Sequence, residues 1–364
     1  MTINRTISVF GGGCAGYSLI KELSKINGID INFYLGTDTV KDNYWGFWEN
    51  KNDSFHFPIH AKWYKWKISD WNNEVDFESR ENPYCIVKRS EWYNFCKNEA
   101  SPKSVKFIRE NIDENNGIYY RKNREVIKSD YIFDCRTKAF EDEVYKQQFK
   151  GFLIEVNESV FDSTVVNLMD FRCNQEDGIQ FIYLLPFSSS LALIEPTTYS
   201  YSTRSDDFYL NTLKKYLLEI YNVKDFKILN EEKGTIPLAL LPADNNIAIS
   251  VGVRGRANRP ASGYTFYFIQ LQVKKAFNCI VKRKDKFNLN IHSLLIRFLD
   301  NIFLDVLKSN PKLAPKIFIS FAKSFTGNEL ADFMTSRIKL KSLFQMIINL
   351  PKLPFIKSFF RNLF

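Results

Sequence analysis

The stretch Ile7–Gly16 constrains the fold of this chain more than any other. It reads as a short apolar strand that breaks into the turn Gly11-x-Gly13-x-x-Gly16 and continues at once into a helical run, residues 17–26. Gly11 permits the tight turn, Gly13 lets the backbone approach a pyrophosphate, and Gly16 lets the helix pack closely on the strand. The N–H groups at the start of the helix favour a phosphate there. The pattern therefore predicts a dinucleotide-binding α/β domain. The predicted phosphate contacts are Gly11, Gly13, Cys14, Ala15 and Gly16.

In such a domain an acidic residue about 20 positions further on binds a ribose of the dinucleotide. Here a second strand, Ile31–Leu35, ends in Gly36-Thr37-Asp38, and Asp38 comes a little late for that spacing. We predict Asp38 as the ribose contact. Two alternatives stay open, because either the turn is shifted or the ribose is held by another group.

Aromatic residues are dense just after this second strand. The run Tyr44-Trp-Gly-Phe-Trp48 is followed by Trp63, Trp66 and Trp71. Trp45, Phe47 and Trp48 are predicted to line an apolar pocket, where their ring faces can stabilise a cation. The alternative is that they form the aromatic core of a cap. The whole chain is 16% aromatic, with 33 Phe among 364 residues, which suits a large apolar ligand but also follows from an AT-rich gene.

Short strands and turns alternate over residues 82–136. Residues 82–89 predict a strand ending at Arg89, followed by a helix over residues 90–98 with Ser90 as its N-cap. Residues 105–109, 117–122 and 125–129 predict a small meander. The run Tyr131–Arg136 is apolar and then abruptly polar, as in a buried parallel strand that ends at a ligand. A plain strand–turn boundary gives the same pattern. Arg89 and Asp134 are the candidate cofactor contacts of this region.

Residues 148–200 carry the patterns of a β-sheet, with strands predicted over 149–156, 164–168, 179–185 and 191–195. Glu195 ends the apolar strand Leu191–Ile194 and precedes Pro196. A carboxylate at the end of a buried strand is costly unless it is paired or functional. Desolvation would raise its pKa and keep it protonated, fit to act as an acid. The alternative is a glutamate that emerges into solvent or bonds to Tyr199.

A second glycine loop follows later in the chain. After a helix over residues 205–221 and a turn at 231–237, an apolar strand over 246–251 enters Gly252-Val-Arg-Gly255. The run Arg259-Pro-Ala-Ser-Gly263-Tyr264 then leads into a helix over residues 266–278. This second strand–loop–helix unit offers another place where N–H groups face a cofactor. The candidate cofactor contacts are Gly252, Gly255 and Gly263, and the candidate substrate contacts are Tyr264 and Phe266.

Residues 289–364 read as helical, with no internal repeat, and the charged residues near their C-terminal end are all basic. The chain carries a net charge of +9, and no acid follows Asp332. The cations beyond it are Arg337, Lys339, Lys341, Lys352, Lys357 and Arg361. Apolar residues recur there at helical spacing, namely Leu340, Leu343, Phe344 and Ile347, then Ile356, Phe359, Phe360 and Leu363. This pattern predicts that the C-terminus docks on an anionic membrane surface without crossing it. The alternative is an ordinary helix packing on the core.

Other classes of partner and site are disfavoured. The basic residues are not interleaved on one recognisable module, which argues against nucleic acid. Six Cys and three His show neither zinc-type spacing nor a disulfide framework, so we expect no metal site. No run of about 18 apolar residues predicts a membrane span. No signal peptide precedes the first strand, so we expect a chain that faces the cytoplasm, peripheral on the inner face of the membrane.

Several motifs, in order along nearly the whole chain, together resemble the lycopene β-cyclase family of flavoproteins. The matching motifs are Gly11-Gly-Gly-Cys-Ala-Gly16, Tyr44-Trp-Gly-Phe-Trp48, Pro83-Tyr84, Gln148-Phe-Lys-Gly151, Met169-Asp-Phe-Arg172, Asp177-Gly178, Phe181-Ile-Tyr-Leu-Leu-Pro186, Leu193-Ile-Glu-Pro-Thr197, Gly234-Thr-Ile-Pro237 and Pro260-Ala-Ser-Gly-Tyr264. Countless flavin and nicotinamide proteins share the glycine turn, whereas the other motifs are far more specific.

The resemblance implies an α/β fold: a Rossmann-like FAD-binding domain, an inserted antiparallel-sheet substrate domain and a helical C-terminal region. It implies reduced FAD, with NAD(P)H as electron source, and lycopene or a related C40 carotenoid as substrate. The family's essential glutamate maps onto Glu195. The expected division is 1–80 and 81–140 for the first parts of the FAD-binding domain, 141–235 for the substrate sheet, 236–280 for the last FAD-binding part, and 281–364 for the helical region.

The chain departs from the family pattern at two positions. Pro196 stands where family members usually carry a second acid, and Arg256 stands where a second glycine is usual. Two other functions therefore stay open. One is a flavin-dependent reductase or monooxygenase acting on a prenyl or aromatic substrate. The other is a carotenoid-binding relative without activity.

Overall fold

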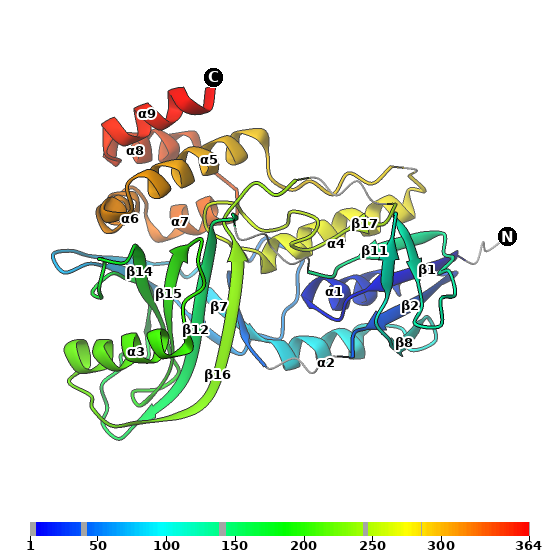
Figure 1. Cartoon of the computed structure of the whole chain (residues 1–364), viewed down its shortest axis with the longest axis horizontal. Helices are drawn as coiled ribbons and strands as arrows, with labels where there is room; N and C mark the ends of the chain where they lie inside the picture. The colour runs from blue at the N-terminus through cyan, green and yellow to red at the C-terminus, as the bar shows by residue number, and fades with distance from the viewer. Residues whose placement is uncertain (1–4, 38–41, 138–142, 243–246, 285, 364) are drawn as a thin grey trace.

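Two large sheets, side by side, organise the molecule (Figure 1). The computed structural model describes residues 5–37, 42–137, 143–242, 247–284 and 286–363. A five-stranded sheet lies in the half that carries the N-terminus, and a seven-stranded sheet forms the other half. The C-terminal helices gather above the seven-stranded sheet, at the opposite side from helix α3. The mixed α/β class expected from the sequence is confirmed.

The five-stranded sheet is parallel and follows the order β17-β11-β1-β2-β8. Its strands are β1 (Arg5–Phe10), β2 (Ile29–Leu35), β8 (Val105–Arg109), β11 (Tyr131–Asp134) and β17 (Ile249–Ser250). Its main helices are α1 (Cys14–Leu23), α2 (Arg89–Glu99) and α4 (Phe266–Val281), with α1 packed against the other two. Apolar side chains of β1, β2 and α1 share one buried cluster with α4. This is the layered arrangement that the glycine turn predicts.

The seven-stranded sheet follows the order β16-β12-β15-β14-β13-β5-β6. Its strands are β5 (Lys65–Ser69), β6 (Glu74–Glu78), β12 (Lys146–Val156), β13 (Val165–Asp170), β14 (Ile179–Pro186), β15 (Leu191–Ser200) and β16 (Phe226–Pro237). All neighbours are antiparallel except β13 and β5. Two of its strands, β5 and β6, come from before residue 80, so the predicted domain boundary there does not follow the sheets.

Two smaller sheets complete the strands. A three-stranded antiparallel sheet, β3-β7-β4, consists of β3 (Tyr44–Trp48), β4 (Ala61–Trp63) and β7 (Tyr84–Lys88). A hairpin consists of β9 (Asp113–Asn115) and β10 (Ile118–Tyr120).

Alternation along β15 decides what each face of the large sheet covers. Ala192 and Ile194 pack in the cluster under α3 (Asp206–Tyr221), whereas Leu193 and Tyr199 pack in the cluster shared with the C-terminal helices. Side chains two residues apart point to the same face of a strand. Glu195 therefore faces the side of the sheet that carries the C-terminal helices, away from α3.

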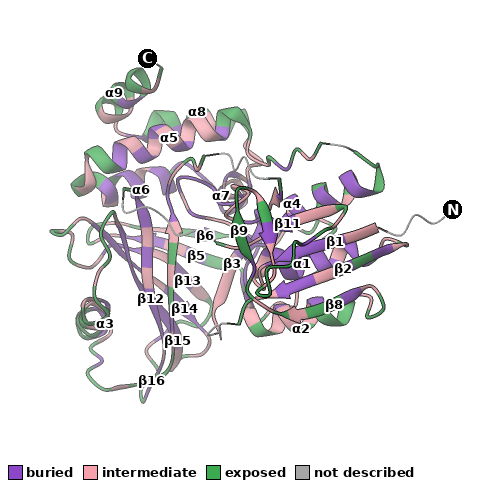
Figure 2. Cartoon of the chain, turned by 45° about the vertical axis from the view of Figure 1, so that its right-hand side comes forward, coloured by how far each residue is buried: buried purple, intermediate pink, exposed green. Residues whose placement is uncertain are grey.

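The C-terminal region is helical, as expected. Its elements are α5 (Leu294–Ser309), the 3₁₀ turn η1 (Pro311–Leu313), α6 (Ala314–Ala322), α7 (Gly327–Met334), α8 (Leu340–Asn349) and α9 (Lys352–Leu363). Helices α6 and α7 contribute many buried side chains to the core, whereas α8 and α9 are largely exposed (Figure 2). In the described ranges, no helix combines the length and the apolar character needed to cross a bilayer.

Four expectations of local structure were wrong. Residues 105–109 pair with β2 in the parallel sheet instead of forming a meander, because β-propensity does not reveal a partner. Ser90 is not an N-cap: Lys88 holds that position, and Ser90 donates to Asp42. Residues 125–129 contribute an isolated bridge and not a strand. Residues 231–237 form the end of the long strand β16 instead of a turn, because pairing along β12 overrides their polarity.

Strand β15 also differs from expectation, since it continues through Glu195 to Ser200. Pro196 lacks an N–H group, and the ladder with β12 is interrupted between the pairs Phe149–Thr197 and Phe152–Ile194. Pairing resumes in the same register on both sides of this gap. Glu195 is therefore in the middle of a central strand instead of at its end.

Candidate active site

The three glycines of the glycine turn have different structural roles. Gly11 has φ +100°, a conformation that L side chains rarely adopt. A Cβ at Gly16 would collide with the Gly11 carbonyl oxygen and the Phe33 ring, so this glycine brings the helix onto the sheet. Gly13 has an ordinary extended backbone, and a Cβ there would enter open space.

That open space fits a bound pyrophosphate. Gly13 is the N-cap of α1 and offers no side chain to the N–H groups of the first turn. Those groups lack partners within the helix and carry the positive end of its dipole. A ligand phosphate at this position would accept their hydrogen bonds. The residues present therefore fit a dinucleotide cofactor.

The second glycine loop lies against the first. Gly252 has φ +76°, and a Cβ there would lie 3.0 Å from the Ala15 Cβ. Gly263 also has a positive φ, and a Cβ there would lie 2.8 Å from Ile236 of β16. A Cβ at Gly255 would collide with the Ser250 carbonyl group. Two chain segments about 240 residues apart thus meet at the start of α1 through close backbone approach.

Asp134 ends β11 beside these loops, and its carboxylate forms ion pairs with two arginines. Its fully buried carboxylate lies 2.7 Å from Arg136 and 3.1 Å from Arg254. Arg254 lines the cavity described below, whereas Asp134 does not. Asp134 is therefore placed to hold Arg254 at the cavity wall instead of contacting a cofactor itself.

One cavity of about 1090 Å³ connects the glycine turn with the large sheet and the C-terminal helices. Gly13, Cys14 and Ala15 line one end of it, and Glu195 lines the sheet side. At the other end, half-exposed Ile356 and Phe360 of α9 belong to the lining, so the cavity reaches the surface there. The glycine turn, the face of the large sheet that carries Glu195 and the C-terminal helices therefore border one continuous space.

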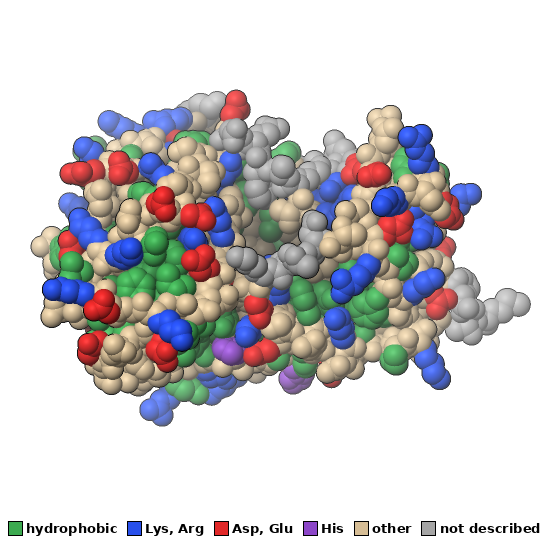
Figure 3. All heavy atoms as spheres, turned by 60° about the horizontal axis from the view of Figure 1, so that its bottom comes forward, with side chains coloured by type: hydrophobic (Ala, Val, Ile, Leu, Met, Phe, Trp, Pro, Cys, Tyr) green, Lys and Arg blue, Asp and Glu red, His purple; other side chains and the backbone are tan. Residues whose placement is uncertain are grey.

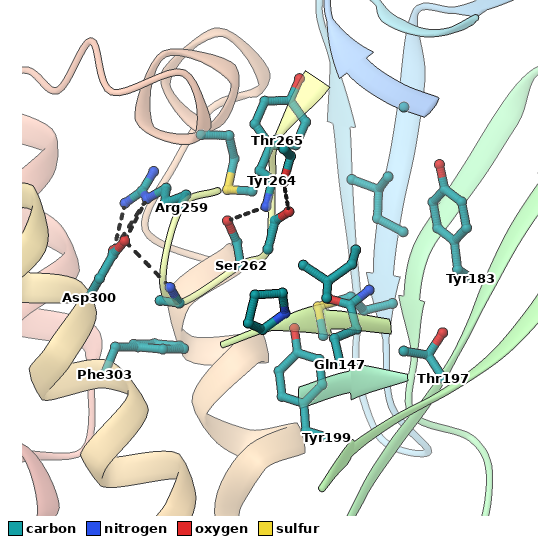
Figure 4. Close-up of a pocket in the computed structure, with 18 of the residues that line it drawn as sticks. Gln147, Tyr183, Thr197, Tyr199, Arg259, Ser262, Tyr264, Thr265, Asp300 and Phe303 are labelled. Carbon is teal, nitrogen blue, oxygen red and sulfur yellow. Dashed lines mark hydrogen bonds and ion pairs between the residues drawn. The ribbon is translucent and has the colours of Figure 1, made fainter. Parts of the chain in front are cut away.

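The large sheet and a loop from the cofactor side face each other across the cavity (Figure 4). Tyr183 and Thr197 lie on the sheet side of this view, and the loop that carries Tyr264 lies opposite them. Arg259 begins this loop, and its buried guanidinium bonds Asp300 of α5 at 3.1 Å. The loop, the sheet and the C-terminal helices are therefore tied together around the cavity.

Glu195 is a buried carboxyl group in the wall of this cavity, with 9% of its surface exposed. Burial, together with the nearby carboxyl group of Glu232, raises the pKa of Glu195 well above its usual value. A carboxyl group in this setting stays protonated near neutral pH, because ionising it would place a charge in a desolvated site.

Aromatic side chains surround Glu195. Tyr183 stands directly across from it on β14, and the Tyr183 hydroxyl lies 2.7 Å from that of Tyr84. The Trp48 backbone N–H donates to the Tyr264 hydroxyl at 2.6 Å, and their ring centroids are 5.5 Å apart. Burial raises the pKa of all three tyrosines, so they remain neutral. Such rings can stabilise a cation that lies over their faces.

Comparison with known proteins identifies the family of this chain. The family model described as lycopene cyclase protein matches residues 6–359. The chain belongs to the lycopene cyclase family. A lycopene beta-cyclase from Pseudescherichia vulneris is 32% identical over 111 residues, and one from Paracoccus sp. (strain N81106 / MBIC 01143) is 33% identical over 105 residues. These matches span 28% and 27% of this chain, and the same shares of the two relatives.

Solved structures share the fold over nearly the whole chain. A geranylgeranyl bacteriochlorophyll reductase-like protein from Thermoplasma acidophilum has a TM-score of 0.62 at 13% identity, covering 98% of this chain and 99% of that one. The flavin-dependent brominase Bmp2 has a TM-score of 0.60 at 11% identity, covering 94% and 98%. At these identities the likeness concerns the fold.

Most of the residues predicted for the site line the cavity. The following line the cavity: Gly13, Cys14, Ala15, Trp45, Trp48, Arg89, Glu195, Gly252, Gly263, Tyr264 and Phe266. Gly11, Gly16 and Gly255 shape the loops from behind it. Phe47 is not in the wall, since it packs fully buried against Phe57 and Phe266. Asp38 lies outside the described residues.

Sequence reasoning missed Glu232. It belongs to β16, is 5% exposed, and lies beside Glu195 although the two are 37 positions apart in the chain. The sequence predicts a turn over residues 231–237, and a turn residue is not expected to be buried. The apolar residues at the start of β16 gave no signal for it. Phe226 and Ile228 pack in the cluster under α3, because the pairing of β16 with β12 shifts register between Leu153 and Ile154. Glu232 lies beyond this shift and faces the other side of the sheet.

Proposed function

We propose that this chain is a lycopene β-cyclase that binds reduced FAD and closes the end groups of a C40 carotenoid into β-rings without net redox. The observation that carries this proposal is Glu195, a buried carboxyl group with a raised pKa in the aromatic wall of a cavity that continues to the glycine turn. Membership in the lycopene cyclase family supports the substrate class.

The reaction needs one proton that is used and recovered. The Glu195 O–H bond breaks as its proton adds to the terminal double bond of the polyene, which leaves a carbocation. The neighbouring double bond attacks that carbon and forms the ring C–C bond. A C–H bond next to the new cation then breaks, and its proton passes to a carboxylate. The product is an isomer of the substrate. A positioned general acid of this kind contributes about 10²–10⁴-fold in rate.

The cavity wall protects the cation. Trp48, Tyr84, Tyr183 and Tyr264 offer ring faces or edges around Glu195. Ring faces stabilise a cation by their electron density, and the apolar lining keeps water from capturing it. Phe149 and Leu193 extend this lining along the large sheet.

The cofactor would be held by backbone more than by side chains. Gly13, Cys14 and Ala15 would bind the pyrophosphate at the start of α1, and Gly252 allows the second loop to approach it. Reduced FAD, with NAD(P)H as its electron source, would supply negative charge near the carbocation. The flavin-dependent brominase of the same fold is consistent with a flavin at this place.

The C-terminal helices would place the cavity mouth on a membrane that holds the carotenoid. Exposed apolar residues of α8 and α9 include Leu340, Phe344, Ile348 and Leu353, each at least 65% exposed. Amphipathic helices of this kind lie in the interface plane of a bilayer. In the view of Figure 3, which brings the side opposite α8 and α9 forward, acidic and basic side chains are interspersed. We therefore propose a peripheral protein on the inner face of the membrane.

Expression in a lycopene-producing host, followed by chromatography of the pigments, tests the function. The natural chain should yield cyclic carotene, Glu195→Gln should leave lycopene unchanged while keeping its flavin, and Glu195→Asp should give partial conversion. If Glu195→Gln cyclises at the natural rate, the acid is another group. A product heavier by oxygen or hydrogen would instead identify a monooxygenase or a reductase.

A further inference from the structure

Glu195, Gly151 and Glu232 lie in one row across three strands. Gly151 pairs with Glu232 of β16. The pairs Phe149–Thr197 and Phe152–Ile194 place Gly151 opposite Glu195 of β15. Directly opposed residues point to the same face of a sheet. The two glutamates therefore flank a position that has no side chain.

The missing side chain is what lets the carboxyl groups meet. A Cβ at Gly151 would lie 2.7 Å from the Glu232 Cγ, 3.1 Å from the Glu232 Oε1 and 3.2 Å from the Glu195 Cγ. Both glutamate side chains thus extend into the space above the glycine. Any larger residue there would push them apart.

One oxygen of Glu232 is left without a donor. Its Oε2 accepts a hydrogen bond from the Tyr44 backbone N–H at 3.0 Å. Its Oε1 is buried and, among the residues that the structure describes, receives no hydrogen bond from an N–H or O–H group. A buried acceptor without a partner is costly. A protonated Glu195 is the group beside it that would supply the missing hydrogen.

We propose that Glu195 and Glu232 share one proton across Gly151, with Glu195 as the acid and Glu232 as the ionised acceptor. This deepens the proposed cyclase function and rests on it for the reaction itself. Glu232 does not line the cavity, so it is a positioning residue that acts through Glu195.

The surroundings favour this division of charge. Burial raises the pKa of Glu232 as well, and the Asp42 carboxylate adds to that rise. The hydrogen bonds from Glu195 and the Tyr44 N–H and the charge of Arg89 oppose it, and no such group opposes the larger rise at Glu195. Among the described residues, the titratable groups that interact with Glu195 are Tyr84, Tyr183 and Glu232, and none of them is a cation. The ionised member of the pair is thus Glu232, on the side of Arg89, and the neutral member is Glu195, at the cavity.

The pair also explains how a proton is recovered. It holds one proton before the reaction and one after it. When Glu195 gives its proton to the polyene, two carboxylates face each other beside the carbocation. Their charge stabilises that cation, and their mutual repulsion favours return of a proton from the ring.

The pH profile of lycopene cyclisation, with reduced FAD and substrate in liposomes, tests the pair. In Glu232→Gln the amide would donate to Glu195 and favour its ionised form, so the loss of activity at high pH should move down by about one pH unit or more. Glu232→Asp keeps the charge with a shorter reach and should lie between. Glu231→Gln is the matched control, because Glu231 is the adjacent residue and pairs with Lys150 at 3.0 Å. A profile of Glu232→Gln that coincides with that of the natural chain would overturn the proposal.

Infrared spectroscopy of the flavin-loaded chain separates this proposal from the function. The carbonyl band of a protonated carboxylic acid should persist to neutral pH in the natural chain. It should be lost in Glu195→Gln and disappear at lower pH in Glu232→Gln. If this holds while no cyclic product forms, the pair stands and the cyclase function fails. If cyclisation occurs and the band does not respond to Glu232, the pair fails and the function stands.

Discussion

The cavity is made of backbone at the cofactor end and of side chains at the acid end. At the first end, Gly11, Gly13 and Gly16 come from one run of six residues, and each acts by lacking a Cβ. At the second, Glu195 and Glu232 come from different strands and meet over Gly151, which belongs to a third. A ligand phosphate needs N–H groups and space, whereas proton transfer needs a carboxyl group in a particular protonation state. The two ends should therefore fail in different ways.

The largest expected effect is at the cofactor end. Gly13→Val should abolish FAD binding while leaving the fold intact, because the added side chain fills the open space and the extended backbone at Gly13 tolerates it. Flavin absorbance and thermal unfolding of the purified chain measure both. Gly13→Ala fills less of the space and should lose less flavin. A Gly13→Val protein that folds and keeps stoichiometric FAD would contradict the assignment.

At the acid end, Glu195→Gln should change how the free energy of unfolding depends on pH. Glu195 has a raised pKa in the folded chain, so its contribution to stability is complete below the unfolded pKa of about 4.3 and is lost as pH rises toward the folded value. Glu195→Gln has no such loss. The free energy of unfolding of Glu195→Gln, relative to that of the natural chain, should therefore increase above about pH 4.3, by at most about 1.4 kcal/mol per pH unit.

Thermal or urea unfolding of the two chains across pH 5–8 measures this difference. Glu155→Gln, at an exposed position of β12, is the control and should follow the natural chain at every pH. A constant difference between Glu195→Gln and the natural chain would mean that Glu195 is ionised in the folded protein.

A smaller effect is expected at the residue between the two carboxyl groups. Gly151→Ala should lower the cyclisation rate about tenfold, since a Cβ there displaces both glutamates from their meeting point. Flavin content should not change. Ala192→Val overpacks the opposite face of the sheet, under α3, and controls for the general cost of added volume. Equal rates for the two variants would assign the loss to packing alone.

The smallest effect is expected where the cavity reaches the surface. Lys357 of α9 is exposed, and its replacement by Gln should weaken binding to anionic vesicles about fivefold, since one charge contributes about 1 kcal/mol near such a surface. Lys214→Gln, on α3 at the other side of the molecule, should have no effect. If the Lys357→Gln chain and the natural chain pellet equally with the vesicles, α9 does not bind an anionic membrane through Lys357.

Point variants are a better test here than truncation after Asp332. Removal of the last 32 residues would also take buried Phe333, Met346 and Leu350 out of the core. The positive charge that the C-terminal segment can offer to a membrane is also smaller than its six cations indicate. Arg337 and Lys339 pair with Asp332, and Arg361 pairs with Asp305. These pairs leave fewer positive charges to meet a membrane.

Local sequence was sufficient where local geometry makes the site. The strand, turn and helix around Gly13 were predicted within a few residues, because their function depends on φ angles and on missing Cβ atoms. The helix expected over residues 205–221 is present as α3, because amphipathic spacing is also a local property of the chain. Glu195 was identified from its apolar neighbours, although it proved to lie inside β15 and not at its end.

By itself, the sequence determined the α/β class, the dinucleotide turn and the presence of a buried glutamate, because periodicity, glycine spacing and apolar neighbours act over a few residues. Only the tertiary structure decided that Glu232 belongs to a strand, that Gly151 separates it from Glu195, and that Phe47 lies in the core. Strand register between residues 151, 195 and 232 is set by pairing across the sheet, and no pattern within any one of these segments specifies its partner.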